Sequence, residues 1–290
     1  MVSLAYVLGL GSALVLPERS DRASASPDST SVPIELTDGG RAVVAVTIEG
    51  KPYRLAVETG SPNTRLSTAA VRDLGLKPAG MRYEEPAFHL DSIRIGEVVV
   101  RKLAVGSGDE VAQLGVDGVL GLDAYADYLL TVDYPGSRLV LSRGSLPRPD
   151  GVEVLRAVRV GPFVGVELDV GGVKEIGVVD TQGGIGFQAL PEVAGRLAFA
   201  GPLRVVGRAV VGGGSPVEIR GARLKGDLKI GRHVFRQPRM AVHPLPPDIP
   251  SKMTIGLRAL RHFRLTLDQR SMRVRFARPD TAAIADRADH

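Results

Sequence analysis

The stretch Leu-Ala-Val-Glu-Thr-Gly-Ser, at residues 55–61, is the strongest indication of the fold of this 290-residue chain. Apolar residues end a short strand, the carboxylate of Glu58 follows, and Thr-Gly-Ser then turns the chain. Residues 177–183 repeat this motif as Gly-Val-Val-Asp-Thr-Gln-Gly, with Asp180 at the position equivalent to Glu58. Two strands that each end in an acid followed by a threonine predict two carboxylates brought face to face.

The segments around the two acids follow the same order in both halves of the chain. A hairpin over 42–58 delivers Glu58, and a hairpin over 164–179 delivers Asp180. Each half later contains an apolar-apolar-Gly segment and a closing hairpin that begins at an aspartate: Val119-Leu120-Gly121 with 133–139, and Thr254-Ile255-Gly256 with 268–274. This order predicts an internal repeat.

Composition favours an all-β protein with two lobes and short helices. Apolar residues make up 44% of the chain, enough for two cores, and short β-branched runs are broken by Gly and Pro. We expect lobes over 40–145 and 154–278, with the Pro- and Gly-rich residues 143–153 at the boundary. Helices are expected over 68–74, capped by Ser67, and from Pro191 to about residue 199.

The two ends of the chain are predicted to lie outside the lobes. Residues 4–16 are apolar and too short to cross a bilayer comfortably, which favours a signal peptide or an N-terminal anchor over residues 1–25. Residues 26–39 are interpreted as a linker and 279–290 as a polar tail. We therefore expect an exported protein, either secreted, periplasmic or in the cell envelope, with membrane association through the apolar segment as an open alternative.

Charge and motifs exclude several other functions. The net charge is +5, but the basic residues are dispersed and have few aromatic neighbours, so no nucleic-acid partner is expected. Five histidines lack metal-ligand spacing, and no cofactor is expected. Gly212, Gly213 and Gly214 fit a hairpin tip better than a phosphate loop. A group of C-terminal arginines is interpreted as a solvated face, with contact to an anionic surface as the alternative: Arg258, Arg261, Arg264, Arg270, Arg273, Arg275 and Arg278.

Two carboxyl groups a few Å apart have a definite chemistry. They cannot both ionise easily, so they share a proton and the pKa of one group rises while that of the other falls. The ionised acid can take a proton from water while the protonated acid polarises a peptide carbonyl. This chemistry requires no metal and no nucleophilic side chain.

The paired motifs resemble those of the pepsin and retropepsin superfamily of aspartic peptidases, and most of all bacterial retropepsin-like proteins with two fused lobes. In that superfamily each lobe carries apolar-apolar-Asp-Thr-Gly-Ser/Ala, then apolar-apolar-Gly, then a closing hairpin. The resemblance covers about residues 40–278 and implies a two-lobed, all-β acid-protease fold with a substrate cleft between the lobes.

The resemblance also implies roles for individual residues. Glu58 and Asp180 would form the catalytic dyad, Thr59 and Thr181 would hydrogen-bond across the lobe interface, and Ser61 would support the first carboxylate. Gly60, Gln182 and Gly183 complete the two acid loops. A hairpin over 76–90, with Tyr83 near its tip, and the hairpin at Gly212, Gly213 and Gly214 would be flaps over a peptide substrate.

The sequence departs from the superfamily at three positions. Glu58 replaces an aspartate, Gln182 replaces a glycine that a positive φ would require, and Gly183 replaces a serine or alanine. Two functions therefore remain open. The protein, expected to be a monomer, is either an aspartic endopeptidase or a degenerate member that binds a peptide or protein without cleaving it.

Overall fold

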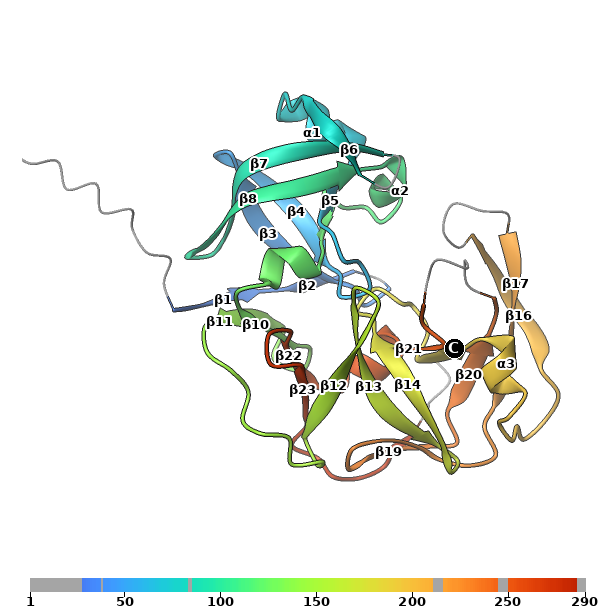
Figure 1. The fold of residues 1–290 in the computed structure, drawn as a ribbon. Coiled ribbons are helices and arrows are strands. Elements are labelled where there is room, and N and C mark those ends of the chain that lie inside the picture. The colour runs from blue at the N-terminus through green and yellow to red at the C-terminus, as the bar shows by residue number, and fades with distance from the viewer. Residues whose placement is uncertain (1–27, 38, 83–84, 211–215, 245–249, 286–290) are drawn as a thin grey trace, which may run out of the picture.

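The computed structural model describes residues 28–37, 39–82, 85–210, 216–244 and 250–285, and it is almost entirely β-structure. Two lobes lie one above the other (Figure 1). The upper lobe contains eight strands in the order β2-β3-β4-β9-β5-β8-β7-β6. Its elements are β2 (Glu35–Leu36), β3 (Ala42–Ile48), β4 (Lys51–Val57), β5 (Arg65–Leu66), α1 (Thr68–Asp73), β6 (Pro78–Arg82), β7 (Glu85–Ile95), β8 (Val98–Ser107), α2 (Asp109–Ala112), β9 (Gly118–Leu120) and the 3-10 helix η1 (Leu122–Tyr125).

The lower lobe repeats this plan and adds a strand near the chain end. Its elements are β12 (Val154–Val160), β13 (Phe163–Val170), β14 (Val173–Val179), β15 (Phe187–Ala189), α3 (Pro191–Ala194), β16 (Arg204–Val210), β17 (Pro216–Arg223), β18 (Leu228–Ile230), β19 (His233–Arg236), β20 (Arg239–Val242), β21 (Met253–Ile255), α4 (Leu257–Leu260) and β24 (Ile284–Ala285). The all-β class with short helices is thus confirmed.

The same strand pairing recurs at the centre of each lobe. In the upper lobe β4 runs parallel to β9, with Val57 opposite Leu120, and β9 is antiparallel to β5. In the lower lobe β14 runs parallel to β21, with Val179 opposite Ile255, and β21 is antiparallel to β15. The predicted internal repeat is therefore present in the strand pairing.

A shared sheet joins the lobes. Strands β10 (Leu129–Asp133) and β22 (Arg264–Asp268) pair antiparallel at its centre, flanked by β11 (Arg138–Ser142) and β23 (Arg273–Ala277). The outer positions are taken by β1 (Ser29–Pro33), which pairs with β11, and by β12, which pairs with β23. The hydroxyl groups of Thr131 and Thr266 lie 2.8 Å apart on the pseudo-two-fold axis.

Two segments expected to lie outside the lobes contribute strands instead. The predicted linker over 26–39 is wrong where β1 and β2 form, because β1 completes the shared sheet against β11. The predicted tail over 279–290 contains β24, which pairs with β19 and buries Ile284. Polar composition concealed β1 and β24 because each lies at a sheet edge, where alternate residues face solvent.

The helices mostly follow the sequence signals. Helix α1 begins after Ser67, whose hydroxyl accepts a hydrogen bond from the backbone N–H of Ala70, and it ends before Gly75, whose φ is +65°. Helix α3 begins at Pro191 as predicted but ends at Ala194, short of the predicted end near residue 199. No helix within the described ranges combines the length and apolar character that a membrane span needs.

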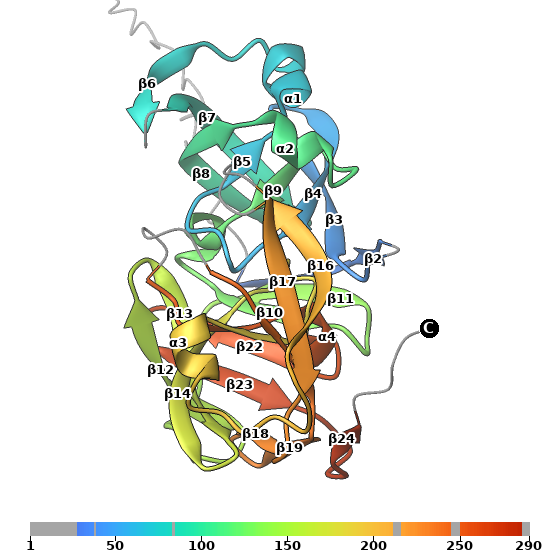
Figure 2. The same ribbon diagram turned by 90° about the vertical axis from the view of Figure 1, so that its right-hand side faces the viewer.

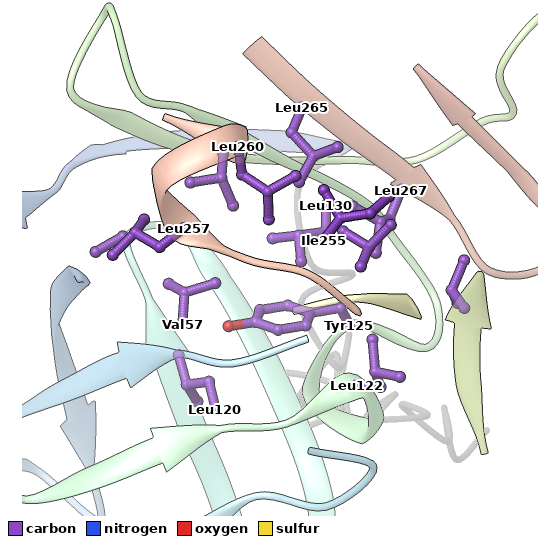
Figure 3. Close-up of a cluster of buried hydrophobic side chains, with 14 of the residues drawn as sticks. Val57, Leu120, Leu122, Tyr125, Leu130, Ile255, Leu257, Leu260, Leu265 and Leu267 are labelled. Atoms are coloured by element: carbon purple, nitrogen blue, oxygen red, sulfur yellow. The ribbon is translucent and has the colours of Figure 1, made fainter. Parts of the chain in front are cut away.

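The apolar core continues from one lobe to the other beneath the acid-bearing strands (Figure 3). Tyr125 lies there among Val57 and Leu120 of the upper lobe and Ile255 of the lower lobe. The Tyr125 side chain is fully buried, and burial raises its pKa well above the ordinary value, helped by the nearby charges of Asp123 and Glu58. This packing gives the acid site a rigid base.

Candidate active site

Each acid follows directly from a strand that is held by its neighbour in the ladder. The backbone N–H of Glu58, after β4, donates to the carbonyl of Leu120 at 2.9 Å. The backbone N–H of Asp180, after β14, donates to the carbonyl of Ile255 at 3.0 Å. The two acids are therefore anchored at equivalent positions of the repeat.

Thr59 and Thr181 connect the two acid loops through four hydrogen bonds. The N–H of Thr59 donates to Oγ1 of Thr181 at 3.0 Å, and the N–H of Thr181 donates to Oγ1 of Thr59 at 3.1 Å. Each hydroxyl also donates across the interface at 2.7 Å, Thr59 to the carbonyl of Val179 and Thr181 to that of Val57. Both threonines are buried, so this network fixes the two loops against each other.

The glycines after β9 and β21 allow the chain to pass close behind each acid loop. A Cβ atom at Gly121 would collide with the backbone of Asn63, and one at Gly256 would lie 2.5 Å from the carbonyl oxygen of Gly183. The N–H of Leu257, the next residue, donates to that same carbonyl at 2.7 Å. Only glycine fits at these two crossings without movement of the backbone.

The carboxylate of Asp180 lies in a confined environment. Its Oδ1 accepts hydrogen bonds from the N–H groups of Gln182 and Gly183, at 2.9 and 3.0 Å. Gly60 of the other lobe packs so closely that a Cβ there would lie 2.5 Å from Oδ1. Burial raises the pKa of Asp180, although the two N–H groups and the charge of Arg41 act in the opposite direction.

The first loop differs from the expectation at Ser61. Its hydroxyl donates to the carbonyl of Asn63 at 2.8 Å, so its single proton is used within the loop and does not support the carboxylate of Glu58. The N–H of Leu122 donates to the Ser61 carbonyl at 2.9 Å. Ser61 therefore stabilises the loop against η1.

Gln182 also differs from the expectation, because its backbone does not adopt a positive φ. The glycine that the superfamily has at this position is therefore not required here by backbone conformation. Instead, the Gln182 side chain reaches to the other lobe, where Nε2 donates to the carbonyl of Val57 at 3.0 Å. This contact places a bulky side chain beside the residue that precedes Glu58.

Two hairpins stand where flaps were predicted. Strands β6 and β7 pair from Pro78–Phe88 to Arg82–Glu85, and β16 pairs with β17. Figure 2 shows β16 and β17 running from the lower lobe toward the upper one. The predicted tip residues Tyr83, Gly212, Gly213 and Gly214 lie outside the described residues. Asp133 and Asp268, at which the two closing hairpins begin, form turns there, each accepting an N–H three residues ahead.

Arg41 is a site residue that the sequence analysis missed. It precedes β3, and its charge lowers the pKa of Asp180 while its own Nε is buried without a hydrogen-bond partner among the described residues. The equivalent position in the second lobe, 122 residues later, is Phe163. The sequence signal that could have identified Arg41 is this difference: a charged residue in the first lobe at the position where the second lobe has the aromatic Phe163. Within the described ranges, no cluster of His, Asp and Glu is arranged to hold a metal ion.

The geometry defines a class of protein: two all-β lobes related by a pseudo-two-fold axis, each presenting an acid and a threonine at their interface. Residues 44–124 match the family model described as aspartyl protease. The matched segment lies within the upper lobe and contains Glu58, Thr59 and Gly121, so the first acid loop and the glycine after β9 are both similar to that family.

Other comparisons give the extent of the similarity. A retropepsin-like aspartic protease from Rickettsia conorii, known from a crystal structure, is 18% identical to this chain. The alignment covers 40% of this chain and 91% of that one, with a TM-score of 0.32. No curated protein matches this chain.

Proposed function

We propose that the protein is an aspartic-type endopeptidase that uses Glu58 and Asp180 to activate water against a peptide bond. The reciprocal hydrogen bonds between Thr59 and Thr181 carry this proposal, because they hold both acid-bearing loops in one two-fold arrangement. The close packing of Gly60 on the Asp180 carboxylate adds a second link between the lobes. A peptidase dyad requires this juxtaposition of equivalent loops.

The roles of the two acids follow from their surroundings. In this proposal Asp180 holds the shared proton, because burial raises its pKa, and Glu58 acts as the base. Glu58 takes a proton from water as the water oxygen bonds to the peptide carbonyl carbon, and Asp180 gives its proton to the carbonyl oxygen. Glu58 then returns a proton to the amide nitrogen and the C–N bond breaks. Asp180 regains its proton from one hydroxyl, leaving a carboxylic acid and an amine.

The substrate of this proposal is an extended segment of peptide or protein. The hairpins β6–β7 and β16–β17 would cover it and pair with its backbone. We further propose that the enzyme acts outside the cytosol, on the basis of the apolar segment at residues 4–16.

A second function, peptide binding without cleavage, is favoured by the contact between Gln182 and Val57. That side chain takes space beside Val57, the residue before Glu58, which a glycine would leave open. The longer Glu58 side chain also moves its carboxylate by about 1.5 Å relative to an aspartate, a displacement of the size that can cost on the order of 100-fold in rate.

One experiment separates the two functions. Purified protein is incubated with an unfolded protein substrate from pH 3 to 7, with and without a transition-state-like inhibitor of aspartic peptidases, and the products are identified by mass spectrometry. The proposal predicts acid-dependent cleavage that the inhibitor blocks and that Asp180→Ala abolishes. Peptide binding without cleavage by the wild-type protein, retained in Asp180→Ala, would establish the second function instead.

A further inference from the structure

The strand β16 forms one end of the sheet in the lower lobe. It is the last strand in the order of that sheet, and in the part of the chain that the structure describes it pairs with β17 alone. The hairpin that it forms with β17 extends from the lower lobe toward the upper one (Figure 2). An edge strand presents backbone N–H and C=O groups with which an added extended segment can pair.

A β-bulge places two exposed valines on this edge strand. The pairing register shifts between Val205 and Gly207, so Val206 is an extra residue in β16. Val206 packs over Gly221 of β17, where a Cβ atom would lie 3.3 Å from its Cγ2. Val205 and Val206 are nevertheless 54% and 58% exposed. Two neighbouring valines exposed to this extent form an apolar surface that an added segment would cover.

The hairpin that carries these valines is basic. Residues 204–223, including the tip, contain four arginines and one glutamate and therefore have a formal charge of +3. The carboxylate of Glu218 lies between two of the arginines, 3.8 Å from Nη2 of Arg208 and 3.5 Å from Nη2 of Arg220. The side chain of Arg208 remains 73% exposed, and Arg204 is exposed as well. The hairpin as a whole therefore attracts negative charge.

The charged and apolar side chains follow a simple order along β16. Arg204 precedes the two valines, and Arg208 follows them after one glycine. An added strand with acidic residues on both sides of two apolar residues would match this order. Charged residues and bulges at a sheet edge can also serve to keep other strands away. The two exposed valines between the arginines favour a binding edge over a merely protected one.

We propose that the outer edge of β16 binds an extended, acidic segment of the protein substrate as an added strand. Apolar side chains of that segment lie against Val205 and Val206, and its carboxylates lie beside Arg204 and Arg208. The proposal rests on the proposed peptidase function only where it identifies the bound segment as substrate. It names a class of substrate, the acidic extended peptide, which the two acids at the lobe interface do not specify.

Fluorescence anisotropy at pH 7 tests the proposal with fluorescein-labelled peptides, because it measures binding whether or not the peptide is cleaved. The first peptide is Glu-Glu-Val-Val-Glu-Glu. In a second peptide glutamine replaces glutamate, and in a third serine replaces valine. The full-length wild-type protein is compared with Arg204→Gln, Arg208→Gln and the double variant. Arg156→Gln is the matched control, since Arg156 is an exposed arginine of β12 in the same lobe. Thermal unfolding verifies that each variant is folded.

The proposal predicts that the wild type binds the first peptide more tightly than the second or the third. Each single arginine variant should weaken binding of the first peptide about threefold and the double variant about tenfold, as expected for exposed ion pairs. Higher ionic strength should also weaken it. Arg156→Gln should bind like the wild type. Amide hydrogen exchange in β16 should slow when the first peptide is bound, whereas exchange in β12 should not change.

Four results would overturn the proposal: no binding of the first peptide, equal binding of all three peptides, equal loss of affinity in Arg156→Gln, or unchanged hydrogen exchange in β16. Its failure is distinguishable from failure of the peptidase function. Binding of the acidic peptide by a protein that cleaves nothing would support the β16 edge and contradict the peptidase. Cleavage with no preference for acidic peptides would do the reverse.

Discussion

Glu58 and Gln182 are two departures from one motif, and the structure connects them. Gly60 is the counterpart of Gln182 in the repeat, and a Cβ at Gly60 would lie 2.5 Å from the Asp180 carboxylate. By the two-fold relation, the Cβ of Gln182 lies against the place that the carboxylate of an aspartate at 58 would take. A glutamate carries its carboxylate one methylene further, beyond this obstruction. We therefore interpret the two residues as a compensating pair.

Because the two residues compensate for each other, substitutions at positions 58 and 182 should have coupled effects on kcat/KM. Glu58→Asp alone should lower kcat/KM at least about tenfold, because the shorter side chain meets the Cβ of Gln182. Glu58→Asp combined with Gln182→Gly should restore kcat/KM to the wild-type level or above. The measurement is a double-mutant cycle on peptide hydrolysis. Additive effects of the two changes would show that these residues act independently.

The raised pKa of Asp180 predicts the direction in which the free energy of unfolding changes with pH. Its pKa in the folded protein is raised above the ordinary value of 3.8, so the folded state binds more protons than the unfolded state in the interval above that value. Its favourable contribution is full at lower pH and is lost as pH rises through the raised pKa. Asp180→Asn, which remains neutral, should therefore gain stability relative to the wild type as pH increases.

Urea unfolding of the two proteins at a series of pH values from 3 to 8 measures this difference. The difference in free energy of unfolding, Asp180→Asn minus wild type, should increase across the interval. A difference that is flat or that decreases would contradict the raised pKa.

At the scale of elements, the chain passes directly behind each acid loop at the glycine that follows β9 or β21. The backbone of the glycine and the backbone of the loop come into close contact there. Gly256 illustrates this, because a Cβ atom there would collide with the carbonyl oxygens of Gly183 and Ile185, and the first of these also accepts the N–H of Leu257. The sequence pattern apolar-apolar-Gly indicated this crossing in both lobes. The reason for glycine is the space available, since neither Gly121 nor Gly256 has a positive φ.

Gly256→Ala should therefore destabilise the protein by at least about 2 kcal/mol, because the added methyl group collides with backbone atoms that cannot move independently. Gly207→Ala is the matched control: Gly207 lies within β16, and a Cβ there would meet no atom within 4 Å. Chemical denaturation of both variants provides the comparison. Equal stability of the two would mean that the crossing is less tightly packed than described.

The elements that the sequence predicted well are those with strong local signals. Strands β4 and β14 both end in buried apolar residues directly before an acid, and α1 has both Ser67 as its cap and Gly75 as its stop. The predictions were wrong where tertiary contacts, and not the local sequence, determine the structure. Strand β1 has a polar sequence and forms because β11 offers an open edge, and Ser61 donates within its loop because the carbonyl of Asn63 is within reach.

At the scale of the whole molecule, the lobes are joined by a continuous sheet. The antiparallel pairing of β10 with β22 makes the shared sheet part of both cores. The repeat in sequence could predict two similar lobes, but it could not predict this pairing, because pairing between lobes leaves no periodic signal in either strand. The acid pair depends on it, since the sheet fixes the relative position of the lobes that carry Glu58 and Asp180.

The hydrogen bond between the hydroxyl groups of Thr131 and Thr266 joins the two lobes, and substituting these residues measures its contribution to stability. Both side chains are buried, so replacing one by valine leaves the other hydroxyl without its partner and should cost about 1–3 kcal/mol. The double variant should cost less than the sum of the single changes by at least about 0.5 kcal/mol. Thermal and urea unfolding of the four proteins measure this coupling, and strict additivity would contradict it.

The central claim is that Glu58 and Asp180 act together as the acid pair, and the most direct measurement is kcat/KM for peptide hydrolysis by Glu58→Gln and Asp180→Asn. Each change keeps the size of the side chain and removes its ability to ionise. The account predicts that both variants fold like the wild type and that each loses at least about 100-fold in kcat/KM. A folded Glu58→Gln variant that retains wild-type kcat/KM would contradict it.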